Sequence, residues 1–266
     1  MPFATVIAAT DLTDRSAHVS GRARRLASAP GARMLLAHVH PAKLRKARLD
    51  EIAAALDAAA RAAGADGTRL LTGEPAPVLQ ALATEEQAGL IVLGLHRERR
   101  VLDLLRLTSM ERIVLAAPCP VLVAQLPPER PYRQVLLATD FSPASAAALI
   151  AAARLAPQAS FHAVHALQLP LGAVFDRGNR ESDAALERAE AARAAFLALP
   201  GLPPLAEPPE IVPGGVHAVL QYRLAELEAD LLCIGTHSGS DPKALGHYAR
   251  DLMRAPPTDV LVARPG

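Results

Sequence analysis

The sequence lacks the features that mark nucleic-acid-binding, membrane-spanning and disulfide-stabilised proteins. Its 28 basic and 27 acidic residues leave a net charge of +1, too small to attract nucleic acid or anionic lipid over a distance. No apolar run approaches the ~20 residues that span a membrane. The N-terminus shows neither the basic region nor the cleavage site of a signal peptide. The two cysteines, Cys119 and Cys233, have no metal-ligand spacing with histidine, so we interpret them as small apolar residues. We therefore expect a cytoplasmic protein with no nucleic-acid or membrane partner.

What the sequence does contain is an internal repeat. Three short segments occur twice, at offsets of 129 (139 − 10), 141 (235 − 94) and 139 (260 − 121) residues. The pairs are Ala9–Asp11 with Ala138–Asp140, Leu90–Gly94 with Leu231–Gly235, and Pro120–Ala124 with Asp259–Ala263. An offset that varies around half of the 266 residues predicts two copies of one domain, with insertions in the loops.

The expected boundaries are a first domain over residues 1–126, a linker over 127–132 and a second domain over 133–266. Each of the two domains is long enough to bury a hydrophobic core of its own. The segment Gln125–Tyr132 holds three prolines in eight residues, which excludes a helix and favours a stiff, extended connection.

Within each copy, short apolar runs alternate with alanine-rich stretches of helical period. This rhythm predicts an α/β fold with a parallel sheet and helices on both faces. The expected strands are 3–9, 33–40, 68–72, 90–93 and 121–124, then 134–138, 160–167, 211–212, 230–234 and 260–263. The expected helices are one ending at 27 (capped by Thr13 or Asp14), 43–63, 78–87 and 104–116, then 144–156, 184–199, 218–228 and 243–253. Residues 172–183 are predicted to form a loop, as is the proline-rich stretch 200–209.

Motifs in matching order in the two copies give a further indication. In the first copy they are Ala9–Asp11 with Ser16, Ala37–Val39, Gly73, Leu90–Gly94 with His96, Glu111–Arg112 and Ala117–Val123. In the second copy they are Ala138–Asp140 with Ser145, Val164–His165, Gly214, Asp230–Gly235 with His237, and Val260–Val262. Over nearly its whole length the chain resembles the universal stress protein family in its tandem form. The resemblance implies two Rossmann-like domains, each an open five-stranded parallel sheet, packed as a pseudo-dimer.

In nucleotide-binding members of that family, ATP lies beyond the carboxyl ends of the strands, and a G-x2-G-x9-G-(S/T) loop holds its phosphates. The first copy keeps Gly94 and Thr108 of this pattern, but Arg97 and Leu107 replace the second and third glycines. A side chain at a positive-φ position costs roughly 1 kcal/mol or more and crowds the phosphates. We therefore expect the first copy to be degenerate for ATP, although Thr10 and Asp11 stand where the family binds adenine and ribose.

The second copy keeps more of the loop. Its candidate residues for a nucleotide or small anion are Thr139, Asp140, Gly235, Ser238, Gly239, Gly246 and His247. Seven residues, rather than nine, separate Ser238 from Gly246. ATP, ADP or AMP binding in the second domain is thus the sequence-based hypothesis. An alternative for Asp11 and Asp140 is an Asx turn or a helix cap directly after a strand.

Metal and catalytic chemistry are not indicated. His38 and His40 point to the same face of one strand, and His96 ends another, but no zinc-type ligand spacing occurs. No nucleophile elbow or Walker A loop is present. We predict no metal and no catalytic residues.

The functional hypothesis is a non-catalytic, stress-related regulatory or binding protein. The alternatives are an interaction protein without a ligand, and a weak ATPase or phosphate-transfer protein. The last strands of the two copies, 121–124 and 260–263, are apolar edge strands that would be adhesive if left bare. The resemblance implies that they pair within the chain, with a homo-oligomer as a further possibility and no protein partner identified.

Overall fold

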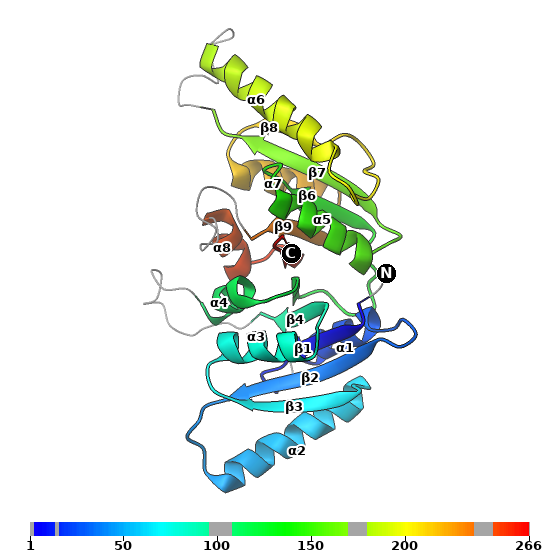
Figure 1. The fold of residues 1–266 in the computed structure, drawn as a ribbon, viewed down its shortest axis with the longest axis vertical. Helices are drawn as coiled ribbons and strands as arrows, with labels where there is room; N and C mark the ends of the chain where they lie inside the picture. The colour runs from blue at the N-terminus through cyan, green and yellow to red at the C-terminus, as the bar shows by residue number, and fades with distance from the viewer. Residues whose placement is uncertain (1–2, 14–15, 96–107, 170–179, 237–246, 266) are drawn as a thin grey trace. The chain divides into compact units, whose positions relative to one another are not determined.

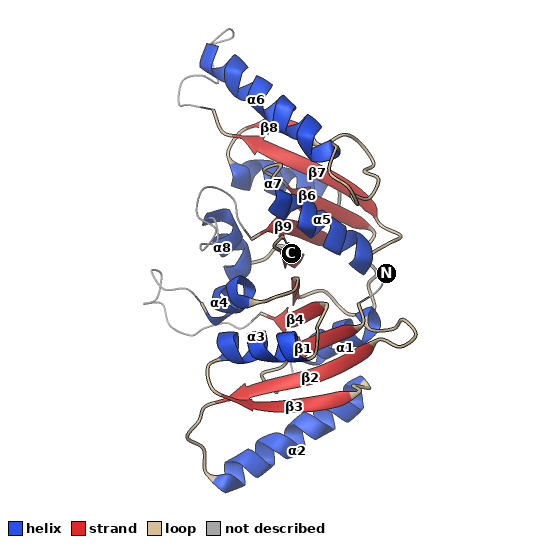
Figure 2. Cartoon of the chain, in the orientation of Figure 1, coloured by secondary structure: helices blue, strands red, loops and turns tan. Residues whose placement is uncertain are grey.

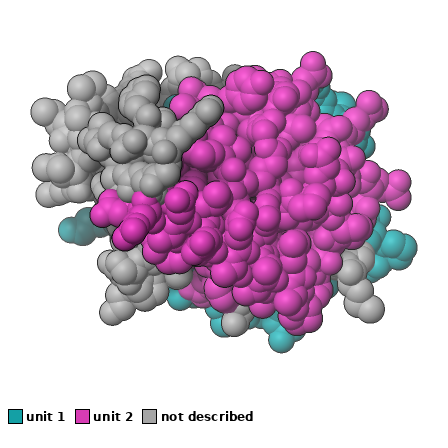
Figure 3. Space-filling view, turned by 90° about the horizontal axis from the view of Figure 1, so that it is seen from above, with its two compact units in different colours: residues 1–131, 252–260, 266 teal, residues 132–251, 261–265 magenta. Residues whose placement is uncertain are grey.

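The computed structural model describes residues 3–13, 16–95, 108–169, 180–236 and 247–265. The chain divides into two compact units, coloured separately in Figure 3. Unit 1 takes residues 1–131 together with 252–260, and unit 2 takes residues 132–251 together with 261–265. A short segment from near the C-terminus, which belongs to the second sequence repeat, is therefore part of unit 1.

Unit 1 is built on a parallel sheet with the strand order β3-β2-β1-β4-β5, of which Figures 1 and 2 label β3, β2, β1 and β4. Its strands are β1 (Thr5–Ala9), β2 (Arg33–His40), β3 (Gly67–Thr72), β4 (Leu90–Gly94) and β5 (Val121–Ala124). In the central strand, Ile7 pairs with Leu35 on one side and with Ile91 on the other. The order of the strands reverses between β1 and β4, where an open parallel sheet commonly forms a ligand site.

The helices of unit 1 follow from local sequence signals. They are α1 (Ala17–Leu26), α2 (Lys46–Ala63), α3 (Pro75–Glu85) and α4 (Ser109–Ala116). Helix α2 ends at Gly64, which adopts a left-handed conformation with φ of 65° that glycine tolerates without strain. Helix α3 begins at Pro75, because proline fits the first helical turn, where its missing N–H is not needed.

Unit 2 repeats the same order of elements. Its elements are β6 (Gln134–Ala138), α5 (Pro143–Leu155), β7 (Ser160–Leu167), α6 (Arg180–Leu197), β8 (Glu210–Pro213), α7 (Val216–Glu226) and β9 (Leu231–Gly235). Two further elements, α8 (His247–Arg254) and β10 (Asp259–Ala263), are shared between the two units. Strands β9, β6, β7 and β8 lie in that order and are parallel.

The structure confirms the α/β fold in two copies and corrects several element boundaries. Helix α1 has Ser16 as its N-cap rather than Thr13, and Asp14 lies outside the described residues. Helix α6 begins at Arg180, so the last part of the predicted loop 172–183 is helical, and its acidic residues Glu181 and Asp183 suit the positive end of the helix. Helices α2 and α3 begin at Lys46 and Pro75 rather than at residues 43 and 78. Residues 172–179, 104–107 and 243–246 of other predicted elements lie outside the described residues.

Cys233 is fully buried in β9, and burial raises the pKa of its thiol, as expected for an inert core residue. Among the helices that the structure describes, none is both long enough and apolar enough to cross a membrane.

One carboxylate of unit 1 makes its stability dependent on pH. Glu86 forms ion pairs with Arg69 and Arg33. The hydrogen bond from Arg69 is the main cause that lowers the pKa of Glu86, burial partly opposes it, and Arg33 adds to the lowering. A lowered pKa stabilises the fold above the ordinary carboxyl value of 4.5, and that contribution is lost as the pH falls through the folded-state value.

We therefore expect Glu86→Gln to flatten the acid dependence of stability. Between about pH 6 and about pH 3, the wild type should lose more free energy of unfolding than the variant, as measured by urea denaturation. The neighbouring, exposed Glu85 provides the control, and Glu85→Gln should keep the wild-type acid slope. Equal slopes for Glu86→Gln and the wild type would contradict this prediction.

Candidate ligand-binding site

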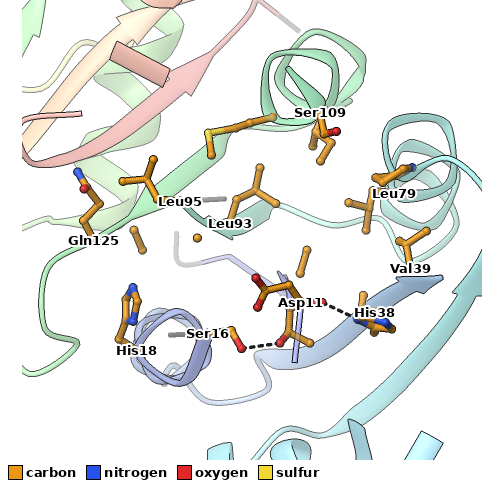
Figure 4. A pocket seen from close by; sticks show the side chains of 18 residues that line it. Asp11, Ser16, His18, His38, Val39, Leu79, Leu93, Leu95, Ser109 and Gln125 are labelled. Atoms are coloured by element: carbon orange, nitrogen blue, oxygen red, sulfur yellow. Dashed lines mark hydrogen bonds between the residues drawn. The ribbon is translucent and has the colours of Figure 1, made fainter. Parts of the chain in front are cut away.

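A cavity of about 590 Å³ opens at the carboxyl ends of the strands in unit 1 (Figure 4). Strands β1, β2, β4 and β5 contribute its floor, and α1, α3 and α4 contribute its walls. Its apolar lining is Ala9, Ala37, Val39, Pro75, Leu79, Leu93, Gly94, Leu95, Met110, Ile113 and Ala124. Its polar lining is Thr10, Asp11, Ser16, His18, His38, Ser109 and Gln125. The cavity lies at the reversal point of the strand order, where parallel sheets bind ligands.

The turn that follows β1 is held by its own side chains. The Thr10 hydroxyl oxygen accepts a hydrogen bond from the backbone N–H of Leu12 (3.0 Å). Asp11 Oδ1 accepts hydrogen bonds from the backbone N–H (3.1 Å) and the hydroxyl (2.7 Å) of Thr13. Leu12 is left-handed, with φ of 58°. Asp11 thus forms the Asx turn that was one of its two expected roles, and it also lines the cavity.

Unit 2 repeats this turn after β6. The Thr139 hydroxyl oxygen accepts from the backbone N–H of Phe141 (2.8 Å), and Phe141 has φ of 63°. Asp140 Oδ1 accepts from the backbone N–H of Ser142 (3.0 Å) and from the Ser145 hydroxyl (2.7 Å). The repeat extends to the next strand of each unit. In unit 1, His38 Nδ1 lies 2.8 Å from the carbonyl oxygen of Thr10. In unit 2, His165 Nδ1 lies 2.8 Å from that of Thr139.

The first glycine of each predicted phosphate loop has a packing role. A Cβ atom at Gly94 would lie 2.8 Å from Val19 Cγ2 of α1. A Cβ atom at Gly235 would lie 2.8 Å from the carbonyl carbon and Cβ of Ala144 and 2.9 Å from the backbone nitrogen of Ser145. Both glycines therefore allow a helix to pack directly against the end of a strand.

Thr108, which matched the serine or threonine of the phosphate loop, is the N-cap of α4. Its hydroxyl oxygen accepts from the backbone N–H of Glu111 (3.2 Å), and its own N–H donates to Glu111 Oε2 (2.6 Å). This reciprocal pair is a capping box. The T-x-x-E spacing of Thr108 and Glu111 indicates a capping box. The assignment of Thr108 to a phosphate loop did not take this spacing into account.

The structure brings together three of the sequence-predicted residues, since Thr10, Asp11 and Gly94 all line the cavity. In unit 2, Thr139 and Asp140 form the equivalent turn, and Gly235 ends β9. His247 is the first residue of α8. Arg97, Leu107, Ser238, Gly239 and Gly246 lie outside the described residues, as do His96 and His237. No cluster of potential metal ligands occurs among the residues that the structure describes.

Gln125 is a cavity residue that the sequence did not single out. Its side-chain nitrogen Nε2 donates to the carbonyl oxygens of Pro256 (2.7 Å) and Thr258 (3.0 Å), and its backbone N–H donates to Asp259 Oδ1 (2.6 Å). The wall of the cavity is thereby tied to the segment 252–260, which belongs to the same unit. A local motif cannot predict these contacts, because the residues that Gln125 contacts lie more than a hundred positions further along the chain.

These features define a tandem Rossmann-like α/β protein whose unit 1 has a cavity at the carboxyl ends of its strands. The sequence profile of the universal stress protein family matches residues 2–125 and 131–264, so the chain belongs to this family and contains two copies of its domain.

The relatives of the chain agree with this assignment. The universal stress protein in the QAH/OAS sulfhydrylase 3′ region of Thermus aquaticus is 29% identical over 137 residues, which cover 46% of this chain and 99% of that protein. A crystal structure of a universal stress protein from Archaeoglobus fulgidus has a TM-score of 0.66 at 17% identity, covering 98% of this chain and 96% of its own. A structure from Pseudomonas aeruginosa, assigned to the same family, has a TM-score of 0.63 at 22% identity, covering 99% and 94%. At these identities the structural likeness concerns the fold.

Proposed function

We propose that this chain is a non-catalytic ligand-binding protein of the stress response, and that the cavity of unit 1 holds its ligand. One observation carries the proposal: the cavity of about 590 Å³ at the reversal point of the sheet. Its volume lies within the range of about 300–1,000 Å³ that is usual for small-molecule sites. An apolar lining with a few polar groups is also typical of such sites.

The hydrogen bonds of the cavity support a binding role over a catalytic one. A serine or threonine nucleophile needs a base that accepts its hydrogen. Here the Thr10 hydroxyl donates to Ser16 Oγ (2.8 Å), and the Ser16 hydroxyl donates to the backbone carbonyl of Thr13 (2.7 Å). Weak ATP hydrolysis is the alternative, and phosphate release from ATP would reveal it.

Nucleotide binding in the second domain is a second candidate function. It is favoured by the repeated turn, in which Thr139 and Asp140 accept the same two backbone hydrogen bonds that Thr10 and Asp11 accept in unit 1. The proposed site adds Gly235, Ser238, Gly239, Gly246 and His247. Three expectations from the sequence also stay predictions. They are the domain boundaries 1–126, 127–132 and 133–266, the cytoplasmic location, and the pairing of the two last strands within the chain.

We expect Val39→Phe to abolish ligand binding by filling the unit 1 cavity. Val39 lies in β2, is half-buried and lines the cavity, so a larger side chain there displaces a ligand rather than core atoms. A thermal-shift assay with ATP and Mg²⁺, ADP, AMP and adenosine should show a stabilisation of about 2.7 kcal/mol by a ligand that is present at a hundred times its Kd. Val39→Phe should remove that stabilisation.

The control uses the equivalent position of unit 2. Since His38 matches His165, Val39 matches Ala166, which is also half-buried. Ala166→Phe should leave the shift unchanged if the unit 1 cavity is the site. A shift lost in Ala166→Phe and in Gly246→Leu, but kept in Val39→Phe, would instead favour the second domain. No shift with any probe would contradict the proposed ligand-binding function.

A further inference from the structure

Three walls of the unit 1 cavity are attached to one short stretch of chain, the segment 252–260, which belongs to the same unit. Figure 4 labels one residue of each wall, namely His18 in α1, Ser109 in α4, and Gln125 directly after β5. The residues that line the cavity include none of the segment itself. The segment therefore acts on the cavity only through the walls that it holds.

The wall at Gln125 is held by both its side chain and its backbone. Nε2 donates to the carbonyl oxygens of Pro256 (2.7 Å) and Thr258 (3.0 Å), and the backbone N–H donates to Asp259 Oδ1 (2.6 Å). All three partners are buried residues of the segment. Hydrogen bonds between buried groups are costly to break, because no water replaces the lost partner. The position of Gln125 in the cavity thus follows the position of the segment.

The wall at α4 is held through Glu111. Its neighbours Met110 and Ile113 line the cavity, whereas Glu111 is 0% exposed and completes the capping box with Thr108. Arg254 Nε lies 3.7 Å from Glu111 Oε1. A buried carboxylate stays ionised only where charges or hydrogen bonds compensate its burial. Arg254 therefore stabilises the carboxylate that caps this helix.

The wall at α1 is held through Arg22. Its Nε lies 3.5 Å from Asp259 Oδ2, and both side chains are buried. His18 lies one turn earlier in the same helix and lines the cavity. Because the helix is a rigid element, the ion pair of Arg22 also restrains the turn that carries His18.

We infer that the segment 252–260 positions the walls of the unit 1 cavity and thereby sets its affinity for a ligand, with Arg254 as a positioning residue. This inference rests on the proposed function and specifies what regulates that same site. Walls that are already in place need no ordering when the ligand arrives, and such preorganisation raises affinity. By linkage, a ligand that contacts these walls also stabilises the attached segment.

The first test removes the charge of Arg254, which does not line the cavity. Isothermal titration calorimetry on the full chain uses AMP, with adenosine as an uncharged second probe. Arg254→Met should raise the Kd about 3- to 30-fold, the usual range for a residue that acts on a site without touching its ligand. Arg254→Lys keeps the positive charge and should restore most of the affinity. The matched control is Arg264→Met, at an exposed arginine outside the segment, which should bind as the wild type does.

The second test needs no ligand. Hydrogen exchange of the free protein, measured by mass spectrometry, reports how firmly each helix is held. Residues 109–116 of α4 should exchange faster in Arg254→Met than in the wild type, and Arg254→Lys should reverse much of this change. Helix α2 provides no lining residue and should exchange at the wild-type rate, which separates a loosened wall from a loss of global stability.

The outcomes separate this inference from the function on which it rests. Suppose that AMP or adenosine binds and that Val39→Phe removes the binding. If Arg254→Met then binds as tightly as Arg264→Met, or if α4 exchanges at the wild-type rate, the inference is overturned while the ligand-binding function stands. If neither probe binds in a way that depends on Val39, the proposed function fails, and this inference fails with it.

Discussion

Replacing Arg22 with methionine is expected to lower the free energy of unfolding by about 3–5 kcal/mol, because it removes the positive charge that forms an ion pair with a buried carboxylate. Arg22 in α1 is 1% exposed and Asp259 in β10 is 0% exposed. Arg22 Nε lies 3.5 Å from Asp259 Oδ2. The carboxylate also accepts from the backbone N–H groups of Gln125 (2.6 Å) and Leu126 (2.7 Å), which hold it in place.

The guanidinium of Arg22 has a second role, since it fixes the proline-rich linker. Its two terminal nitrogens donate to the carbonyl oxygens of Arg130 (2.6 Å) and Pro127 (2.9 Å). Methionine has a comparable length but no donors, so both carbonyls lose the hydrogen bond from Arg22, while that of Pro127 keeps the one from the backbone N–H of Arg130 (3.1 Å).

Urea denaturation followed by circular dichroism measures the loss. The matched control is Arg25→Met, in the same helix but at an exposed position, which should change stability by no more than about 0.5 kcal/mol. The double variant with Arg22→Met and Asp259→Leu removes both charges and should recover part of the loss. If Arg22→Met is as mild as Arg25→Met, the ion pair does not contribute to stability.

The second large effect is expected at Gly235, where Gly235→Ala should cost about 3 kcal/mol, the upper end of the usual range for overpacking. The added Cβ would meet backbone atoms of α5 at 2.8 to 2.9 Å, and a helix backbone cannot turn aside as a side chain can. Helix α5 would have to move away from the end of β9. That movement would also disturb the turn that holds Asp140, because Ser145 lies at the point of contact.

The equivalent glycine of unit 1 is the natural control. Among the residues that the structure describes, the added Cβ at Gly94 would meet only Val19 Cγ2, a methyl group that can shift, so Gly94→Ala should cost about 1 kcal/mol. Thermal unfolding of the two variants, each compared with the wild type, measures the difference. Equal losses at the two positions, or a larger loss at Gly94, would contradict the argument.

Local patterns predicted the sheet well. The sequence predicted the bounds of four strands, namely β2, β5, β6 and β7. A short apolar run between polar residues is typical of a buried parallel strand, so its ends are visible in the sequence. The first turns of helices were predicted less well. Alanine-rich sequence keeps the same helical pattern on both sides of a helix boundary, so the pattern does not locate the first residue of the helix. Helix α3, for example, begins at Pro75 rather than at the predicted residue 78.

The site was predicted only in part. Thr10, Asp11 and Gly94 could be found because they belong to short motifs that occur twice. Gln125 and Arg22 could not, because their importance comes from contacts with the segment 252–260. Arg22 and Asp259 are 237 residues apart (259 − 22) in the chain. Hydrophobic periodicity carries no information about a pair at that separation.

The assignment of residues 252–260 to unit 1 means that the two sequence repeats are not interchangeable building blocks. Cutting the chain at the linker would separate Arg22 from Asp259. It would also separate Asp259 from the backbone N–H groups of Gln125 and Leu126, which donate to its carboxylate. Residues 252–260 of the second repeat complete the unit that the first repeat begins, so the two repeats depend on each other to fold.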